Sequence, residues 1–179
     1  MKTLIIHPDD RTTDFLKDIY LSLAEYTLVT RGTKEEVDLL ITSHDRVIMC
    51  GHGSPYGLFS VKQFGSSSYI IDSDSVSLLK GKTCIYIWCD ADKFVQANSL
   101  KGLYSGMFVS EVIESIMMGI GPVPQRVVDQ SNKYFAKVMG KNIRNDLFEI
   151  YQNVLKTYRN FAKDNIVADY NVKRFYLNI

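Results

Sequence analysis

Short apolar runs recur along the chain, and each ends at a turn or at a charged residue. Leu4-Ile5-Ile6 is followed by His7-Pro8-Asp9-Asp10, and residues 46–50 are followed by Gly51-His52-Gly53. Residues 83–88 form a near-continuous apolar run, which is typical of a strand covered on both faces. The pattern predicts strands at residues 4–6, 27–30, 46–50, 69–71, 83–88, 103–109 and 172–179.

Between the predicted strands, apolar residues recur at the three- and four-residue spacing of an amphipathic helix. After the first strand, the positions with this spacing are Phe15, Leu16, Ile19, Leu23 and Tyr26. Thr33 and Glu36 have the spacing of a capping box at the start of the next helix. Further helices are predicted at residues 73–79, 92–100, 111–118, 125–139 and 144–163.

This alternation of strands and helices is typical of a mostly parallel sheet with helices on both faces. We therefore expect an α/β fold, a three-layer sandwich with a flavodoxin-like core. The connections are too short to hold a second domain, so residues 1–179 are expected to form a single domain. A chain of this length buries roughly 70% of its unfolded surface, which is enough for a core without disulfides or metal.

The composition is that of an ordinary globular protein, with 46% hydrophobic residues, 23% charged residues and a formal net charge of +1. A net charge this close to zero gives no general electrostatic attraction to nucleic acid or to an anionic membrane. The N-terminal apolar run is too short for a signal peptide, and no run approaches the ~18 residues of a membrane helix. We expect a cytoplasmic protein that binds neither nucleic acid nor membrane.

The three cysteines are Cys50, Cys84 and Cys89. An odd number of cysteines without a secretory signal argues against a disulfide framework. Cys50 and Cys84 lie within apolar runs, and we interpret them as packing residues. Cys50, His52 and Cys89 lack the paired spacing of structural zinc sites, so no metal site is expected.

Three predicted strands end in residues that can carry chemistry. The first is followed by His7, Asp9 and Asp10, the third by His52, and the strand at residues 83–88 by Cys89. Ligands bind at the carboxyl ends of the strands in open parallel sheets, close to the switch in strand order. If these strands are neighbours, all three ends meet at one edge of the sheet.

The residues around two of these strand ends give a more specific indication of function. The third strand ends in VIMCGHGSPYGLF, and the strand at residues 83–88 continues as CIYIWCDAD. A strand ending in His-Gly followed by a strand ending in Cys resembles the caspase-like cysteine peptidases, a clan that includes metacaspases, legumains, gingipains and clostripain. The phrase GHGSPYGLF is most similar to the bacterial members. His52 and Cys89 lie 37 residues apart, against about 50 in caspases, and the resemblance covers residues 1–118.

The resemblance implies an endopeptidase that needs no cofactor and acts on a peptide or protein substrate through a thioester. It assigns Cys89 as the nucleophile and His52 as the general acid and base, which fits the chemistry of a thiolate beside an imidazole. Backbone N–H groups of Gly53 and Cys89 would stabilise the oxyanion. By analogy with caspases, the edge of the last strand at residues 172–179 is where a homodimer would form.

Specificity is the point at which the sequence departs from the family. Clostripain-like and metacaspase-like proteins have an acidic residue two positions before the cysteine, where this chain has Ile87. Residues after the first strand also line the specificity pocket in this clan, so Asp9 or Asp10 is expected to select a basic side chain. Asp90 is a third candidate substrate contact, with helix capping as its alternative.

A non-enzymatic alternative stays open beside the peptidase. In this second hypothesis the chain is an inactive caspase-like or flavodoxin-like domain that binds a partner or a small ligand. A nucleotide-sensing domain has only the fold class to favour it. His7 is interpreted as a turn residue and His44 as a solvated cap.

Overall fold

The computed structural model describes residues 1–61 and 68–179. Contacts within the chain divide it into two compact units. Unit 1 comprises residues 1–14, 24–106 and 176–179, and unit 2 comprises residues 15–23 and 107–175. The single domain expected over residues 1–179 stays a prediction.

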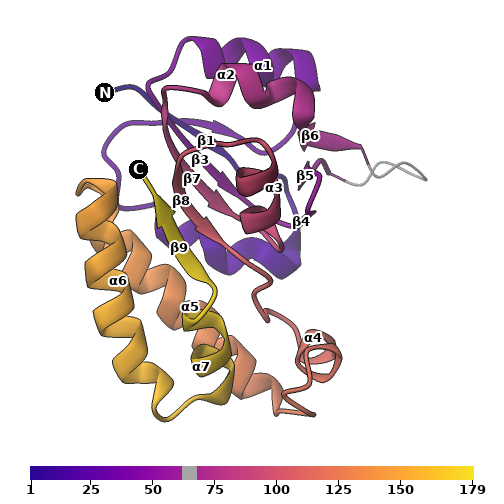
Figure 1. Cartoon of the computed structure of the whole chain (residues 1–179), viewed down its shortest axis with the longest axis vertical. Coiled ribbons are helices and arrows are strands. Elements are labelled where there is room, and N and C mark those ends of the chain that lie inside the picture. The colour runs from indigo at the N-terminus through magenta and orange to yellow at the C-terminus, as the bar shows by residue number, and fades with distance from the viewer. Residues whose placement is uncertain (62–67) are drawn as a thin grey trace. The chain divides into compact units, whose positions relative to one another are not determined.

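A six-stranded sheet forms the centre of unit 1 (Figure 1), with the order β2-β1-β3-β7-β8-β9. The strands are β1 (Thr3–Ile6), β2 (Thr27–Val29), β3 (Arg46–Cys50), β7 (Thr83–Ile87), β8 (Gly102–Ser105) and β9 (Phe175–Asn178). The pairs β1–β2, β1–β3, β3–β7 and β7–β8 are parallel. The mostly parallel α/β sheet is therefore confirmed, and its first five strands have the flavodoxin-like order 2-1-3-4-5.

Alternate residues of these strands point to one face of the sheet, where they form an apolar cluster with three helices. Helices α1 (Lys34–Thr42), α2 (Val76–Leu79) and α3 (Ala91–Ala97) lie over this face (Figure 1). Burial of each large aliphatic side chain stabilises the fold by about 1.5–3 kcal/mol. The strand residues of the cluster include Leu4, Ile6, Val47, Met49, Cys84 and Tyr86, and the helix residues include Val37, Ile41, Leu79, Phe94 and Val95.

The predicted capping box at the start of α1 is confirmed. The Thr33 hydroxyl accepts a hydrogen bond from the Glu36 N–H at 3.3 Å, and the Glu36 carboxylate accepts one from the Thr33 N–H at 2.9 Å. These bonds satisfy two of the backbone donors that the first turn of a helix leaves unpaired.

A second, antiparallel sheet follows β3 and contains β4 (Gly53–Ser54), β5 (Gly57–Phe59) and β6 (Tyr69–Ile71). Pro55 and Tyr56 form the turn between β4 and β5. Gly57 has a φ of +147°, and a Cβ at this position would lie 1.9 Å from the Ile71 carbonyl oxygen. Only glycine fits there. The 3₁₀ helix η2 (Ser73–Ser75) then leads into α2.

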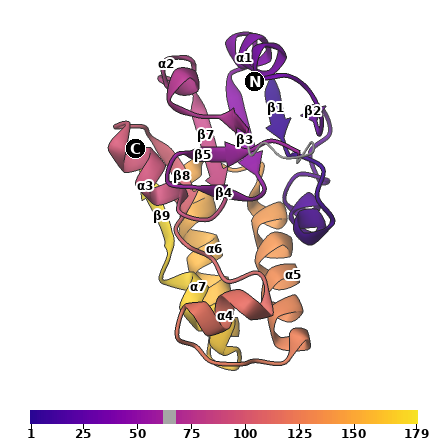
Figure 2. The ribbon, with the colours of Figure 1, turned by 90° about the vertical axis from the view of Figure 1, so that its right-hand side faces the viewer.

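Unit 2 is helical, with α4 (Val112–Met117), α5 (Gln125–Asn142), α6 (Leu147–Ala162) and α7 (Ile166–Val172). Helices α5 and α6 lie side by side (Figure 2), with the Tyr134 and Phe161 rings stacked at 4.1 Å between centroids. The Phe135 ring meets those of Phe108 and Tyr158 edge-on or tilted, at 5.0 and 5.5 Å. Residues 15–19 of the 3₁₀ helix η1 (Arg11–Ile19) also belong to this unit.

Several element boundaries differ from the predictions. Strand β8 ends at Ser105 and does not reach residue 109, and η1 ends at Ile19 as a 3₁₀ helix. Helix α7 was not predicted, and β9 begins only at Phe175, although it is the edge strand that was expected. Across the parts of the chain that the structure describes, no helix combines the length and the apolar character that crossing a membrane requires.

The prediction for His44 is wrong. Its side chain is buried, with Nδ1 2.7 Å from the Leu40 carbonyl oxygen and Nε2 3.0 Å from the Thr27 hydroxyl. A buried imidazole needs a partner for each ring nitrogen, and α1 and β2 each supply one. His44 therefore ties the end of α1 to the start of β2.

Candidate active site

The three strand ends that carry reactive residues are neighbours, because β1, β3 and β7 lie side by side in the sheet. In a sheet of order 2-1-3-4-5, the switch in strand order falls between the first and third strands, and ligands bind in the crevice beyond it. The residues after β1 and β3 flank this switch point. The candidate site therefore lies where the topology favours ligand binding.

The register of β3 and β7 places His52 and Cys89 at matching positions. Cys50 pairs with Ile87 in the parallel ladder, and His52 and Cys89 each follow two residues later. The Gly51 N–H donates a hydrogen bond to the Ile87 carbonyl oxygen at 3.1 Å, so the pairing continues to the base of both loops. The two candidate catalytic residues leave the sheet from adjacent strands at the same edge.

Cys89 differs from the other two cysteines in its exposure. Cys89 is half-buried, whereas Cys50 and Cys84 are buried. Burial raises the pKa of Cys50 well above the ordinary range of a thiol, and burial raises the pKa of Cys84 to about 11. Because the thiolate is the nucleophile, neither buried cysteine is suited to catalysis. The interpretation of Cys50 and Cys84 as packing residues is confirmed.

The backbone turns sharply after Cys89. Asp90 adopts a left-handed conformation, with a φ of 64° and a ψ of 23°. Such a conformation is uncommon for a residue other than glycine, although aspartate tolerates it better than most. This turn ends β7 and begins α3 within two residues of Cys89.

His52 is held by a chain of hydrogen bonds that runs back to the loop after β1. Its Nε2 lies 2.6 Å from the Thr12 hydroxyl, which donates to Asp10 Oδ1 at 2.7 Å. A hydroxyl has one proton, so Thr12 must accept the proton of His52 Nε2. In the neutral ring this leaves Nδ1 as the nitrogen with a free lone pair.

The sequence did not predict Thr12 as a residue of the candidate site. It follows a turn and precedes an apolar periodic segment, so its position indicated only a helix cap. Asp10 also accepts the Thr12 N–H at 2.9 Å, which makes a local turn around its carboxylate. The residue types alone do not reveal that this turn reaches a histidine 40 positions further along the chain.

Gly53 lies against the indole ring of Trp88, the residue before Cys89. A Cβ at Gly53 would be 2.2 Å from Trp88 Cδ1, and the Trp88 Nε1–H donates to the Ser54 carbonyl oxygen at 3.2 Å. The Phe59 N–H donates to the His52 carbonyl oxygen at 2.9 Å. Since hydrogen-bonded pairs alternate in an antiparallel ladder, the Gly53 N–H lies outside the β4–β5 ladder.

Each of the three predicted substrate carboxylates has a partner within the chain. Asp9 forms an ion pair with Arg31 at 2.9 Å, and Asp90 forms one with Lys93 at 3.0 Å. Asp10 accepts the two hydrogen bonds from Thr12. His7 is buried, with Nε2 3.2 Å from the Thr13 hydroxyl.

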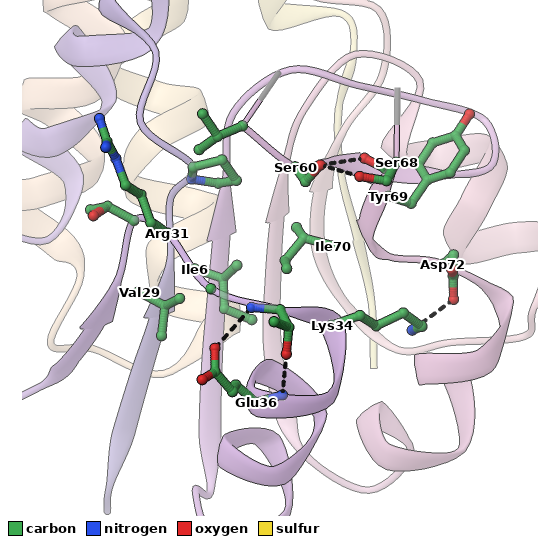
Figure 3. A pocket seen from close by; sticks show the side chains of 15 residues that line it. Ile6, Val29, Arg31, Lys34, Glu36, Ser60, Ser68, Tyr69, Ile70 and Asp72 are labelled. Carbon is green, nitrogen blue, oxygen red and sulfur yellow. Dashed lines mark hydrogen bonds and ion pairs between the residues drawn. The ribbon is translucent and has the colours of Figure 1, made fainter. Parts of the chain in front are cut away.

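A cavity of about 910 Å³ opens at the same edge of the sheet, beside the ends of β1 and β2 (Figure 3). Its walls come from the loop between β2 and α1, the first turn of α1, and the strand β6. Its volume is within the 300–1,000 Å³ that is common for ligand pockets.

No model of a known protein family matches the chain, and no curated protein matches it either.

Proposed function

We propose that this chain is a caspase-like cysteine endopeptidase with Cys89 as its nucleophile and His52 as its general acid and base. The observation that carries the proposal is the pairing of β3 with β7, because His52 and the half-buried Cys89 follow the ends of these two strands. The sequence motifs CGHG and WCD at the ends of these two strands support the same assignment. Cys50, Cys84 and Cys89 form no disulfide, which suits a reducing compartment such as the cytoplasm.

Catalysis would begin with transfer of the Cys89 proton to His52. The thiolate attacks the scissile carbonyl carbon, which forms a C–S bond and moves an electron pair onto the carbonyl oxygen. The N–H groups of Gly53 and Cys89 would stabilise this oxyanion. The carbonyl then re-forms as the C–N bond breaks, and the imidazolium gives its proton to the leaving amine.

Hydrolysis of the thioester returns the enzyme to its starting state. Water attacks the acyl carbon while His52 takes one of its protons. The C–S bond then breaks to release the acid, and the imidazolium returns the proton to the Cys89 thiolate. The imidazolium formed in each half-reaction donates through Nε2 to Thr12, whose own proton is held by Asp10. Thr12 and Asp10 are therefore positioning residues that orient the ring.

Selective alkylation of Cys89 tests this proposal. Native protein would be treated with iodoacetamide at pH 6, where an unperturbed thiol is almost wholly protonated, and the modified site located by mass spectrometry. We expect fast modification of Cys89 alone, and loss of this rate in His52→Ala, because the imidazole generates the thiolate. Cys50 and Cys84 are internal controls that stay unmodified.

Slow alkylation of Cys89 that His52→Ala leaves unchanged would contradict the peptidase. The remaining hypothesis would then be a domain of the same fold that binds a partner without chemistry.

A further inference from the structure

The cavity beside β1 and β2 has an apolar floor. Ile6, Val29 and Ile70 point into it from three different strands (Figure 3). Ile6 and Ile70 are buried, and Val29 is half-buried. An aliphatic floor of this kind gains affinity for an apolar group by removing apolar surface from water.

Among the residues that the structure describes, the charged groups lining this cavity already have partners. Lys34 Nζ contacts Asp72 at 2.9 Å, Asp38 at 3.4 Å and the Ser75 hydroxyl at 2.7 Å. An ammonium has three donors, so these contacts occupy the Lys34 side chain. Burial disfavours the charged form, but the hydrogen bond and charges of Asp72 and Asp38 raise the pKa of Lys34 above its ordinary value.

The other ionic groups of the cavity are bound in the same way. The Arg31 guanidinium donates to Asp9, and the Glu36 carboxylate accepts the Thr33 N–H in the capping box. An anionic or cationic ligand would compete with these partners for the charged groups. A neutral, apolar group fits the floor without this competition.

The walls of the cavity are continuous with the candidate catalytic loops. Pro8 lines the cavity, and its Cδ lies 3.6 Å from the Cβ position of Gly51, the residue before His52. Ser60 lines it as well, next to Phe59, whose N–H donates to the His52 carbonyl oxygen. A peptide held at His52 therefore has the cavity beside it.

We infer that this cavity is a specificity pocket for an apolar side chain of the peptide substrate, either branched aliphatic or aromatic. The inference rests on the proposed peptidase function for the nature of the ligand. It is an alternative to the basic specificity expected from Asp9 and Asp10, whose carboxylates already bind Arg31 and Thr12. The selecting element is the floor formed by Ile6, Val29 and Ile70.

Binding of short peptides to the Cys89→Ala protein tests the pocket without requiring any chemistry. Tripeptide amides of the form acetyl-Ala-Ala-X-amide and acetyl-Ala-X-Ala-amide, with X as Leu, Phe, Arg or Asp, would be titrated by calorimetry. We expect the Leu or Phe peptides to bind about tenfold or more tightly than the Arg and Asp peptides. Equal binding of all four, tighter binding of Arg, or no binding of Leu and Phe would overturn the inference.

A matched pair of substitutions in β2 locates the binding site. Val29→Asp, made in the Cys89→Ala background, places a carboxylate in the floor and should weaken the Leu peptide about tenfold or more while strengthening the Arg peptide. Leu28→Asp is the control, since Leu28 is 43% exposed and successive strand residues point to opposite faces. If both substitutions have the same effect, the peptide does not occupy this cavity.

The two proposals can fail separately. Iodoacetamide is too small to need the pocket, so its reaction with Cys89 reports on the dyad alone. Peptide binding to Cys89→Ala reports on the pocket alone.

Discussion

At Thr12, one hydroxyl oxygen decides which nitrogen of His52 carries a proton. The Thr12 hydroxyl donates to Asp10 and must therefore accept from Nε2. The nitrogen that hydrogen-bonds to a fixed acceptor sets the tautomer, and the other nitrogen is left for chemistry. The side chain of Thr12 is exposed, so it can be changed without disturbing the core.

Thr12→Val removes the hydroxyl and keeps the shape of the side chain. We expect alkylation of Cys89 at pH 6 to slow roughly tenfold, a part of the 10²–10⁴-fold that a positioned acid or base contributes. We also expect the Nε2–H tautomer to lose its dominance, which ¹⁵N NMR of labelled His52 would measure. Thr12→Ser, which retains the hydroxyl, should restore both properties.

A purely structural role for Thr12 would leave the tautomer ratio of His52 unchanged in Thr12→Val. That result would remove Thr12 and Asp10 from the proposed mechanism.

At the scale of elements, the β4–β5 hairpin joins the two candidate catalytic loops. Gly53 lies between the Trp88 ring and the Gly57 carbonyl, with no room for a Cβ on either side. Trp88 itself is buried, and its indole N–H holds Ser54. The hairpin, the end of β3 and the end of β7 are thus packed as one structure.

Gly53→Ala should displace this hairpin. The added methyl group would lie 2.2 Å from Trp88 Cδ1 and 2.6 Å from the Gly57 oxygen, and overpacking of this kind commonly costs about 1–3 kcal/mol. We expect urea denaturation to show this loss in the free energy of unfolding, together with slower alkylation of Cys89. Gly32→Ala is the control, because its nearest neighbour is the flexible Glu36 carboxylate at 3.2 Å.

Unchanged stability and reactivity in Gly53→Ala would mean that the hairpin does not support the candidate site.

The sequence predicts the parallel strands that carry the candidate site, but it does not predict the hairpin and the side-chain contacts around that site. Leu4–Ile6 and residues 83–88 are apolar runs bounded by turn residues, a local pattern that any parallel sheet requires. The hairpin at Gly53–Phe59 has two very short strands, too short to show an alternating pattern. The contact of Thr12 with His52 spans 40 residues and depends on the strand order, which no local pattern contains.

Substrate specificity is also hard to predict from the sequence, because it depends on contacts between distant residues. Asp9 and Asp10 stand where a basic pocket would place its acids, but their partners Arg31 and Thr12 come from a loop 22 residues away and from a local turn. Contacts of this kind decide how strongly a carboxylate is already bound within the fold, and spacing along the chain does not reveal them. The apolar floor is equally hidden, because its residues come from β1, β2 and β6.

At the scale of the whole molecule, the chain passes repeatedly between the two units. Unit 2 is built from residues 15–23 and 107–175, and residues 176–179 then return to unit 1. There Tyr176 packs on Tyr104, with ring centroids 5.6 Å apart, and Asn178 donates to the Leu100 carbonyl oxygen at 3.0 Å. Because neither unit is one continuous segment, we expect both to unfold in a single cooperative transition.

Buried Cys84 offers a reporter of this coupling, since it lies in β7 of unit 1 and reacts only when the sheet opens. Ile150→Val removes one buried methyl group from α6 of unit 2, where Ile150 is fully buried, and should cost about 1 kcal/mol. If the units open together, the labelling rate of Cys84 in mild urea should rise about fivefold, the factor that corresponds to 1 kcal/mol. Ile116→Val in α4 is the matched control, because Ile116 is 49% exposed and the same change there should leave the rate unaltered.

A lower melting temperature for Ile150→Val without faster labelling of Cys84 would instead mean that unit 2 opens alone. The sheet with its candidate active site would then be stable independently of the helices.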